Sequence, residues 1–420
     1  MHCSRVLMPL LAALVIRSHA AYSRELINVT NLTLAAAVEQ AVSENLELKS
    51  LRAKWESMLE RPIQAGALPN PMLTYGGMDM AEGGEWPDTG EKRIMAQQEF
   101  PWFGKRTLRT RIAMKEAESL RHELERKIRD VIMSVKENYY DLCAVRKVIA
   151  ITTEEQAVLQ SMTDTAGTQY AAGVRDQVDV LKAQTEVSML KQKLLDLQAR
   201  EITRLARLNT TLNRRADTPL GTVQQPPEIT FPGTFESLFT VAVTNWPDVL
   251  AAQTQVDRYA LEQQLMDKES FPDYKLGVEY RDVDAGDNML MFTVSVALPI
   301  WRKKNSAAVR EAEKMKVSSE ASREAAKQKN ALDIQESLFN LQTAQRKLVL
   351  IRTELLPQAE ARFRASEVAY RTGKVDFMDF LESERFRLNT KTMAAMEEGS
   401  AGMQAARLER ALGTEMSTSE

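Results

Sequence analysis

The sequence predicts a chain of long α-helices that carries two β-hairpins, with one plan of elements occurring twice. Glycine (17) and proline (14) are sparse among the 420 residues, and the charged residues (27%) are well mixed, a composition typical of long helices. Two segments of alternating polarity interrupt the helical patterns and indicate strands. Five residues also recur in register about 200 residues apart, which indicates an internal duplication.

The duplication is clearest at two short turns that contain glycine. The matched residues are Tyr170 and Tyr370, Gly173 and Gly373, Asp176 and Asp376, Asp179 and Asp379, and Leu181 and Leu381. We therefore expect a first repeat over residues 21–218, a linker over 219–233, a second repeat over 234–413 and a tail over 414–420.

The first 20 residues resemble a signal peptide. Arg5 precedes an apolar run, and Ser18-His19-Ala20 has the small residues of a cleavage site. The apolar run is shorter than the roughly 20 residues that cross a bilayer. The alternative to a signal peptide is a buried N-terminal helix. Cleavage would remove Cys3 and leave Cys143 alone, so we expect no disulfide and no cysteine zinc site. The chain is expected to be periplasmic, secreted, or held in the outer membrane by strands.

The first repeat is expected to begin with one helix over residues 32–66, capped by Thr33 and ended by Pro69-Asn70-Pro71. A β-hairpin over residues 72–100 follows, with a loop at 79–91. A helix from 103 to about 172 then has apolar residues at steps of three, four and seven, as in a coiled coil. Gly173 makes a turn, and a second helix runs from 174 to about 213.

The second repeat follows the same order. We expect a helix over residues 234–269, a β-hairpin over 273–298 with a turn at 284–287, and a long helix to Thr372 that is punctuated by Pro357. The turn at Gly373 leads to a last helix that ends near Gly413.

The four predicted strands cannot close a barrel within one chain. Each is about 10 residues long, the length that crosses a bilayer when tilted, and their apolar and polar residues alternate. Open edges in lipid would leave backbone groups without hydrogen bonds. Three copies would supply about twelve strands, so we predict a transmembrane β-barrel shared by several chains and continued by long helices.

This plan resembles the TolC family of trimeric outer-membrane efflux channels over nearly the whole mature chain. The segments that carry the resemblance are Pro69-Asn70-Pro71, residues 100–106 (FPWFGKR), Phe271-Pro272-Asp273, residues 355–359 (LLPQA) and residues 370–384. Each segment alone is a weak signal, but the order and spacing of the segments together match those of the family.

The resemblance implies a homotrimer in the outer membrane that extends into the periplasm, with a twelve-stranded barrel above a helical tube. It implies two partners, a periplasmic adaptor and an inner-membrane pump, and no cofactor or catalysis. Residues 101–106 resemble most the branch that serves heavy-metal exporters of the resistance-nodulation-division type. Lipid-anchored relatives carry a cysteine at the mature N-terminus, which this chain lacks, so no attached lipid is expected.

The resemblance also implies an acidic periplasmic gate just beyond the second turn. The matching positions are Asp379 and Glu382, one helical turn apart on one face. In a trimer their carboxylates would approach one axis, repel one another and attract cations. The first repeat has Asp179 and Lys182 instead, and the lysine could pair with a carboxylate of the neighbouring helix and hold the mouth shut. An ordinary solvated helix face is the alternative.

Gly173 and Gly373 lie at the expected tips of the helical hairpins. Glycine there tolerates a positive φ and allows another backbone to approach. We predict that the tips dock the adaptor, with simple turn geometry as the alternative.

Aromatic residues gather at the strands and their ends, as in the girdles of membrane barrels. They are Tyr75, Trp86, Phe100, Trp102, Tyr274, Tyr280 and Trp301. Six methionines lie in or near the hairpins, and thioethers bind Cu(I), but adaptable packing or lipid-facing surface is the commoner role. They are Met72, Met78, Met80, Met95, Met289 and Met291. His122 is expected on a helix surface.

Two other functions fit the sequence less well. A periplasmic coiled-coil adaptor, or another structural protein of an export complex, would also have helical hairpins but would not need two hairpins of membrane-crossing length. An enzyme is not indicated, because the chain has no P-loop, dinucleotide turn, nucleophile elbow or His-Glu-x-x-His helix. A net charge of -3, with no basic patch among interleaved aromatics, gives no indication of a nucleic-acid partner.

Overall fold

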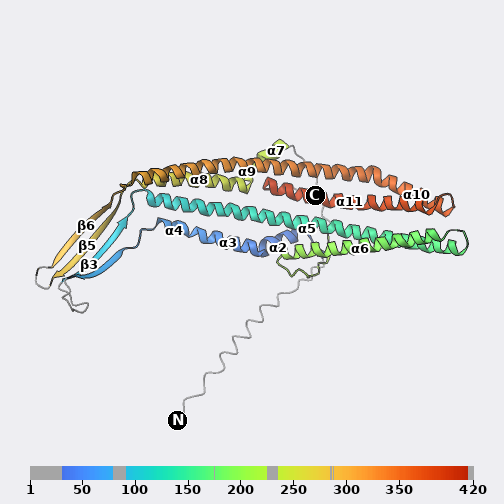
Figure 1. The fold of residues 1–420 in the computed structure, drawn as a ribbon, viewed down its shortest axis with the longest axis horizontal. Coiled ribbons are helices and arrows are strands. Elements are labelled where there is room, and N and C mark those ends of the chain that lie inside the picture. Colours follow the sequence, from blue (N-terminus) through green and yellow to red (C-terminus); the bar gives the residue numbers. More distant parts are fainter. Residues whose placement is uncertain are drawn as a thin grey trace, which may run out of the picture.

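The computed structural model describes residues 31–78, 91–174, 176–224, 235–283, 286 and 288–414. The chain forms a long rod with a β-sheet at one end and two helical hairpin tips at the other (Figure 1). The expected signal peptide, most of the first hairpin's loop with Trp86 and Met80, and most of the linker lie outside the described residues.

The two repeats have the predicted order of elements. The first contains β1 (Asn31–Leu32), α2 (Leu34–Glu44), α3 (Leu46–Leu59), α4 (Arg61–Gly66), β2 (Met72–Met78), β3 (Glu91–Phe100), α5 (Lys105–Ala171), α6 (Gln177–Thr211) and β4 (Thr222–Val223). The second contains α7 (Phe235–Asn245), α8 (Pro247–Lys268), β5 (Asp273–Val283), β6 (Met289–Ala297), α9 (Arg302–Leu350), η1 (Ile351–Leu355), α10 (Leu356–Arg371) and α11 (Phe377–Leu412).

The prediction of one unbroken helix at the start of each repeat is wrong. Asn45 is extended, with φ -61° and ψ 124°, and its side chain accepts hydrogen bonds from the backbone N–H groups of Glu47 and Leu48. It therefore caps α3 and ends α2. At the matching place Trp246 is extended and Pro247 begins α8, because the residue before a proline avoids helical backbone. The predicted cap at Thr33 is confirmed, since its side chain accepts from Ala36 N–H.

The interruption of the long helix expected at Pro357 is a widened, π-helical turn. The π-helical segment η1 lies between α9 and α10 and ends two residues before Pro357. Proline has no N–H to donate and its ring crowds the preceding turn, so a local π-turn lets the helical path continue.

The strands form one antiparallel sheet in the order β2-β3-β5-β6. Pairing of β3 with β5, for example Ile94 with Tyr280, joins the hairpins of the two repeats. Strands β2 and β6 are the sheet's edges within the chain. No helix in the described residues has the length and hydropathy needed to cross a membrane.

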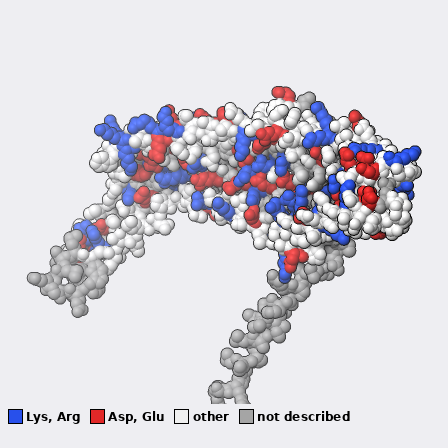
Figure 2. All heavy atoms as spheres, turned by 45° about the vertical axis from the view of Figure 1, so that its right-hand side comes forward, with Lys and Arg blue, Asp and Glu red and all other residues white. Residues whose placement is uncertain are grey.

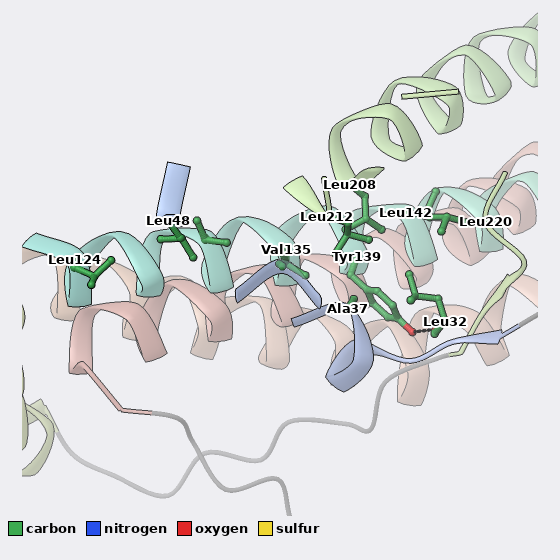
Figure 3. Close-up of a cluster of buried hydrophobic side chains, with 12 residues drawn as sticks. Leu32, Ala37, Leu48, Leu124, Val135, Tyr139, Leu142, Leu208, Leu212 and Leu220 are labelled. Carbon is green, nitrogen blue, oxygen red and sulfur yellow. Dashed lines mark hydrogen bonds between the residues drawn. The ribbon is translucent and has the colours of Figure 1, made fainter. Parts of the chain in front are cut away.

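Helix α5 runs most of the length of the rod. Helices α2, α3 and α4 lie along its half nearest the sheet, and α6 lies along its far half (Figure 1). The second repeat arranges α8 and α11 in the same way beside α9 and α10. The core at mid-length gathers α2, α3, α5 and α6 (Figure 3). There the buried Tyr139 hydroxyl donates to the carbonyls of Leu32 and Gln224, at 2.9 and 2.6 Å, and so holds β1 and β4 against α5.

Candidate functional site

One face of the sheet is apolar across all four strands. The register aligns Leu73, Ala96, Val278 and Phe292 in one row, and the side chains of this face are exposed on the chain. Phe292 has 74% of its surface exposed and Val294 70%, which are large values for apolar side chains. A face of this kind requires an apolar environment around it.

The opposite face of the sheet is polar. Arg281 pairs with Glu91 at 2.8 Å and with Glu279 at 2.9 Å, and Lys275 pairs with Glu99 at 3.1 Å. By register, Met72, Met95, Met289 and Met291 share this polar face rather than the apolar one. Among the described residues, no group of three His, Cys, Asp or Glu side chains is placed to hold a metal ion. Binding of Cu(I) by these methionines therefore stays the less favoured alternative to a role in packing.

The predicted aromatic residues lie towards both ends of the sheet. Tyr75 and Tyr280 flank Ile94 in one row on the apolar face. At the helical end, the ring of Tyr274 stacks on Phe100 with centroids 5.5 Å apart. The Trp102 ring stacks on Phe271, also at 5.5 Å, and Trp301 is 71% exposed. Aromatic residues at two levels along an apolar face are typical of a protein that crosses a membrane.

A buried lysine fixes the junction between helices and sheet. The Lys105 side chain is 1% exposed, and its Nζ lies 2.9 Å from Asp273 Oδ1, 3.0 Å from Glu269 and 3.1 Å from the Phe271 carbonyl oxygen. The same Asp273 oxygen accepts from Trp102 N–H at 2.7 Å. The motif at residues 100–106 therefore ties the first repeat to the first strand of the second, a role that its sequence did not reveal.

The backbone turns at the two tips are alike. Gly173 and Gly373 have φ of 72° and 73°, and each N–H donates to the carbonyl of the tyrosine three residues before. The N–H of the residue after each glycine donates to the carbonyl of the residue before that tyrosine, at 2.9 Å in the first tip and 2.8 Å in the second. This is a glycine helix cap that requires a positive φ. A Cβ at either glycine would meet nothing within 4 Å, so the space above both is open on the chain.

The packing beneath the two tips differs. Tyr370 is 1% exposed and packs on Phe377 and Phe380, with ring centroids 5.6 and 5.4 Å apart. Its counterpart Tyr170 is 46% exposed, as are about half of Val178 and Leu181 on α6. The second tip is therefore stabilised within the chain, whereas the first presents an apolar surface.

The predicted gate residues lie near these tips. Asp379 is exposed, and its N–H donates to the Asp376 side chain that caps α11. Glu382 is also exposed but pairs with Arg362 of α10 at 3.1 Å. Asp179 and Lys182 are half-buried on α6. Within the described residues no ion pair of Lys182 is found, so the expected latch contact is not made inside this part of the chain.

A buried ionic network, which the sequence did not reveal, joins α5 and α11 near the tips. Glu155 of α5 and Glu384 of α11 are each 1% exposed. Arg387 contacts Glu155 at 2.5 Å and Glu384 at 3.0 Å, and Lys391 contacts Glu155 at 2.9 Å. The Arg387 guanidinium also lies 3.7 Å over the ring of Phe363 from α10. The network therefore joins three helices of the tip.

The two buried carboxyls differ in their affinity for protons. Burial, and then the hydrogen bond to Glu155, raise the pKa of Glu384 from 4.5 to about 8. Burial disfavours ionisation of Glu155 as well, but hydrogen bonds from Glu384 and Lys391 and the charge of Arg387 hold the pKa of Glu155 below its usual value. The pair therefore shares one negative charge near neutral pH.

The expectation that His122 lies on a helix surface is wrong. The residue is 5% exposed, and its Nδ1 lies 3.1 Å from Glu125 Oε2 one turn along α5. The periodicity of so long a helix does not reveal every face that a neighbouring helix covers.

The fold and the sheet together define a membrane-embedded protein with a long helical extension. The chain belongs to the outer membrane efflux protein family, whose sequence model matches residues 37–214 and 238–414. The two matches fall on the two repeats, so the internal duplication is confirmed. The predicted function as an outer-membrane efflux channel is confirmed with it.

Several known proteins are similar along most of their length. The cobalt-zinc-cadmium resistance protein CzcC of Cupriavidus metallidurans is 23% identical over 389 residues, which cover 91% of this chain and 90% of CzcC. The outer-membrane channel OprN superimposes with a TM-score of 0.79 at 18% identity, covering 90% and 89% of the two chains. CusC gives 0.79 at 15% identity, with 91% and 92% covered. These structures share the fold of this chain.

Proposed function

We propose that three copies of this chain form one channel, which passes substrates from an inner-membrane pump and a periplasmic adaptor through the outer membrane. The observation that carries this proposal is the sheet, which has an apolar face, a polar face and two open edges. Joining β6 of one copy to β2 of the next would satisfy the edges and close a barrel of about twelve strands. The apolar face would then meet lipid, and the polar face would line the lumen.

The helical part also has two edges that a neighbouring copy would cover. Near the tips α6 packs on α5, α5 on α11, and α11 on α10, which leaves α6 and α10 at the sides of the layer. Exposed apolar residues occur at both sides. They are Val178, Leu181, Met189, Leu195 and Ile202 on α6, and Phe339, Val349, Leu350 and Val368 on α9 and α10. Contact between these sides would extend the barrel into a closed helical tube.

The acidic residues near the second tip form the gate of this proposed tube. Asp379 gives the stronger contribution, because the charge of Glu382 is partly compensated by Arg362. In a trimer the Asp379 carboxylates would meet at one axis, where they repel one another and attract cations. Asp179 and Lys182 form the first-repeat side of the mouth, with Lys182 placed to pair with a carboxylate of a neighbouring copy.

The open space above Gly173 and Gly373 forms the docking surface for the adaptor. A trimer would present about six such tips. The exposed apolar residues of the first tip, Tyr170 and Val174, add surface that a helical partner can cover.

The exported substrates are proposed to be heavy-metal cations. The likeness to CzcC supports this choice, and an acidic gate suits cationic cargo. A strain lacking this chain is expected to become sensitive to cobalt, zinc or cadmium, and the full-length chain is expected to restore growth. Sensitivity to dyes and antibiotics alone would show that the channel serves a different pump.

A further inference from the structure

Helix α9 begins with three consecutive cations, Arg302, Lys303 and Lys304, which we call the junction basic patch. All three side chains are exposed. Within the described ranges none of them lies within ion-pair distance of a carboxylate, although many other lysine and arginine side chains of this chain are paired. Three adjacent like charges repel one another, so they do not favour the fold by themselves.

The duplication provides an internal comparison for this patch. Lys105 and Arg106 of the first repeat match Lys303 and Lys304. Lys105 is buried against Asp273 and Glu269, and Arg106 donates to the Gly66 carbonyl oxygen at 2.8 and 2.6 Å. The first pair of cations therefore holds the junction together, whereas the second has no such partners in the described chain.

The patch lies directly beside the apolar end of the sheet. Leu298, Ile300 and Trp301 follow β6 and are 70%, 67% and 71% exposed. Figure 2 shows lysine and arginine side chains gathered where the helices meet the sheet. Tryptophan prefers the boundary between hydrocarbon and headgroups, and lysine and arginine extend from there to phosphate.

We propose that Trp301, Arg302, Lys303 and Lys304 bind the headgroups of anionic phospholipids in the periplasmic leaflet of the outer membrane. This inference rests on the proposed function, because it requires the sheet to lie in that membrane. Trp301 and Ile300 enter the acyl boundary, and the three cations contact phosphate oxygens from the helical side. The site sets the depth at which the channel sits and favours anionic over zwitterionic lipid.

The test uses the full-length trimer in phosphatidylethanolamine vesicles, with and without phosphatidylglycerol. Brominated forms of each lipid report contact by quenching tryptophan fluorescence. We expect brominated phosphatidylglycerol to compete for the wild-type protein several-fold better than brominated phosphatidylethanolamine. The variant R302Q/K303Q/K304Q should lose most of this several-fold preference, because the three cations are the groups that attract the anionic headgroup.

A matched control removes three exposed cations far from the sheet, in the variant K191Q/R364Q/K374Q, and should keep the wild-type preference. Replacing Trp301 by Phe should remove most of the selective quenching of tryptophan fluorescence. The trimer of this variant should still melt at a higher temperature in vesicles that contain phosphatidylglycerol than in vesicles that lack it. An unchanged preference in R302Q/K303Q/K304Q, with normal trimers and conductance, would overturn the lipid site alone. A wild-type protein that inserts into neither vesicle would overturn the proposed channel and the lipid site together.

Discussion

Arg387 of α11 holds Glu155 of α5 at 2.5 Å, with both side chains largely removed from water. The same guanidinium contacts Glu384 on its own helix and lies over Phe363 of α10. The contact thus connects the two halves of the duplicated chain near the tips.

Replacing Arg387 by Met is expected to destabilise the tip by about 3–5 kcal/mol, because the single negative charge shared by the buried Glu155 and Glu384 loses its main counter-charge. Thermal unfolding of the purified trimer measures the loss. Arg371→Met serves as the control, since Arg371 forms an exposed pair with Glu367 and should cost at most about 0.5 kcal/mol. Equal effects of the two changes would show that the network does not stabilise the tip.

The stability of the tip should fall as the pH rises from about 4.5 to about 8. The native state binds the Glu384 proton more tightly than the unfolded state does, because the pKa of Glu384 is raised from 4.5 to about 8. The stability that this proton contributes is therefore complete below the unfolded pKa of 4.5 and is lost as the pH rises through the folded pKa of about 8. Glu384→Gln should remove this slope, and Glu382→Gln, which changes an exposed neighbour, should keep it. Hydrogen exchange of α11 at a series of pH values gives the measurement; equal slopes in all three proteins would refute the assignment.

Replacing Asp379 by Asn should raise the single-channel conductance and weaken block by multivalent cations, because the proposed ring loses its charge. Glu382→Gln should act in the same direction but less, since Glu382 already pairs with Arg362. Planar bilayer recordings measure both quantities. Asp196→Asn, an exposed carboxylate along α6, is the control; if Asp379→Asn resembles it, the gate lies elsewhere.

Two glycines in long helices should respond to alanine in opposite ways. A Cβ at Gly402 of α11 would lie 2.2 Å from a ring carbon of Tyr140, so Gly402→Ala should destabilise the contact with α5 by about 1–3 kcal/mol. A Cβ at Gly167 of α5 meets nothing within 4 Å, and Gly167→Ala should stabilise the helix by about 0.5–1 kcal/mol. The melting temperatures of the two variants should move apart; a shared direction would contradict the packing described.

Bulky residues at Gly173 or Gly373 should abolish efflux while leaving trimers in the outer membrane. Both glycines have a positive φ, so some loss of local stability is expected, and Ala at the same position is the control for that strain. Growth on the exported metal and the amount of trimer in membrane fractions are measured together. Normal efflux in Gly373→Leu would reject a docking role for that tip.

The sequence predicts the elements well because their signals are local. Alternating residues mark β5 and β6, and Gly173 and Gly373 mark the tips. The breaks at Asn45 and Trp246 were missed because a single capping residue leaves the helical periodicity on both sides intact.

The candidate site was predicted only in part, since several of its contacts join residues far apart in sequence. Glu155 and Arg387 are separated by 232 residues, and Lys105 and Asp273 by 168. The sequence likewise gives no sign that Arg362 compensates Glu382, or that Tyr170 and Tyr370 differ so strongly in burial. Duplication predicts equal backbone turns, whereas packing depends on which helices each repeat meets.

The most direct test of the central claim is a cryo-electron microscopy structure of the full-length protein in lipid nanodiscs. The proposed channel requires three copies around one axis, with β6 of each copy hydrogen-bonded to β2 of the next and the apolar face of the sheet against lipid. A monomer or a dimer with the edges of β2 and β6 left open would contradict it.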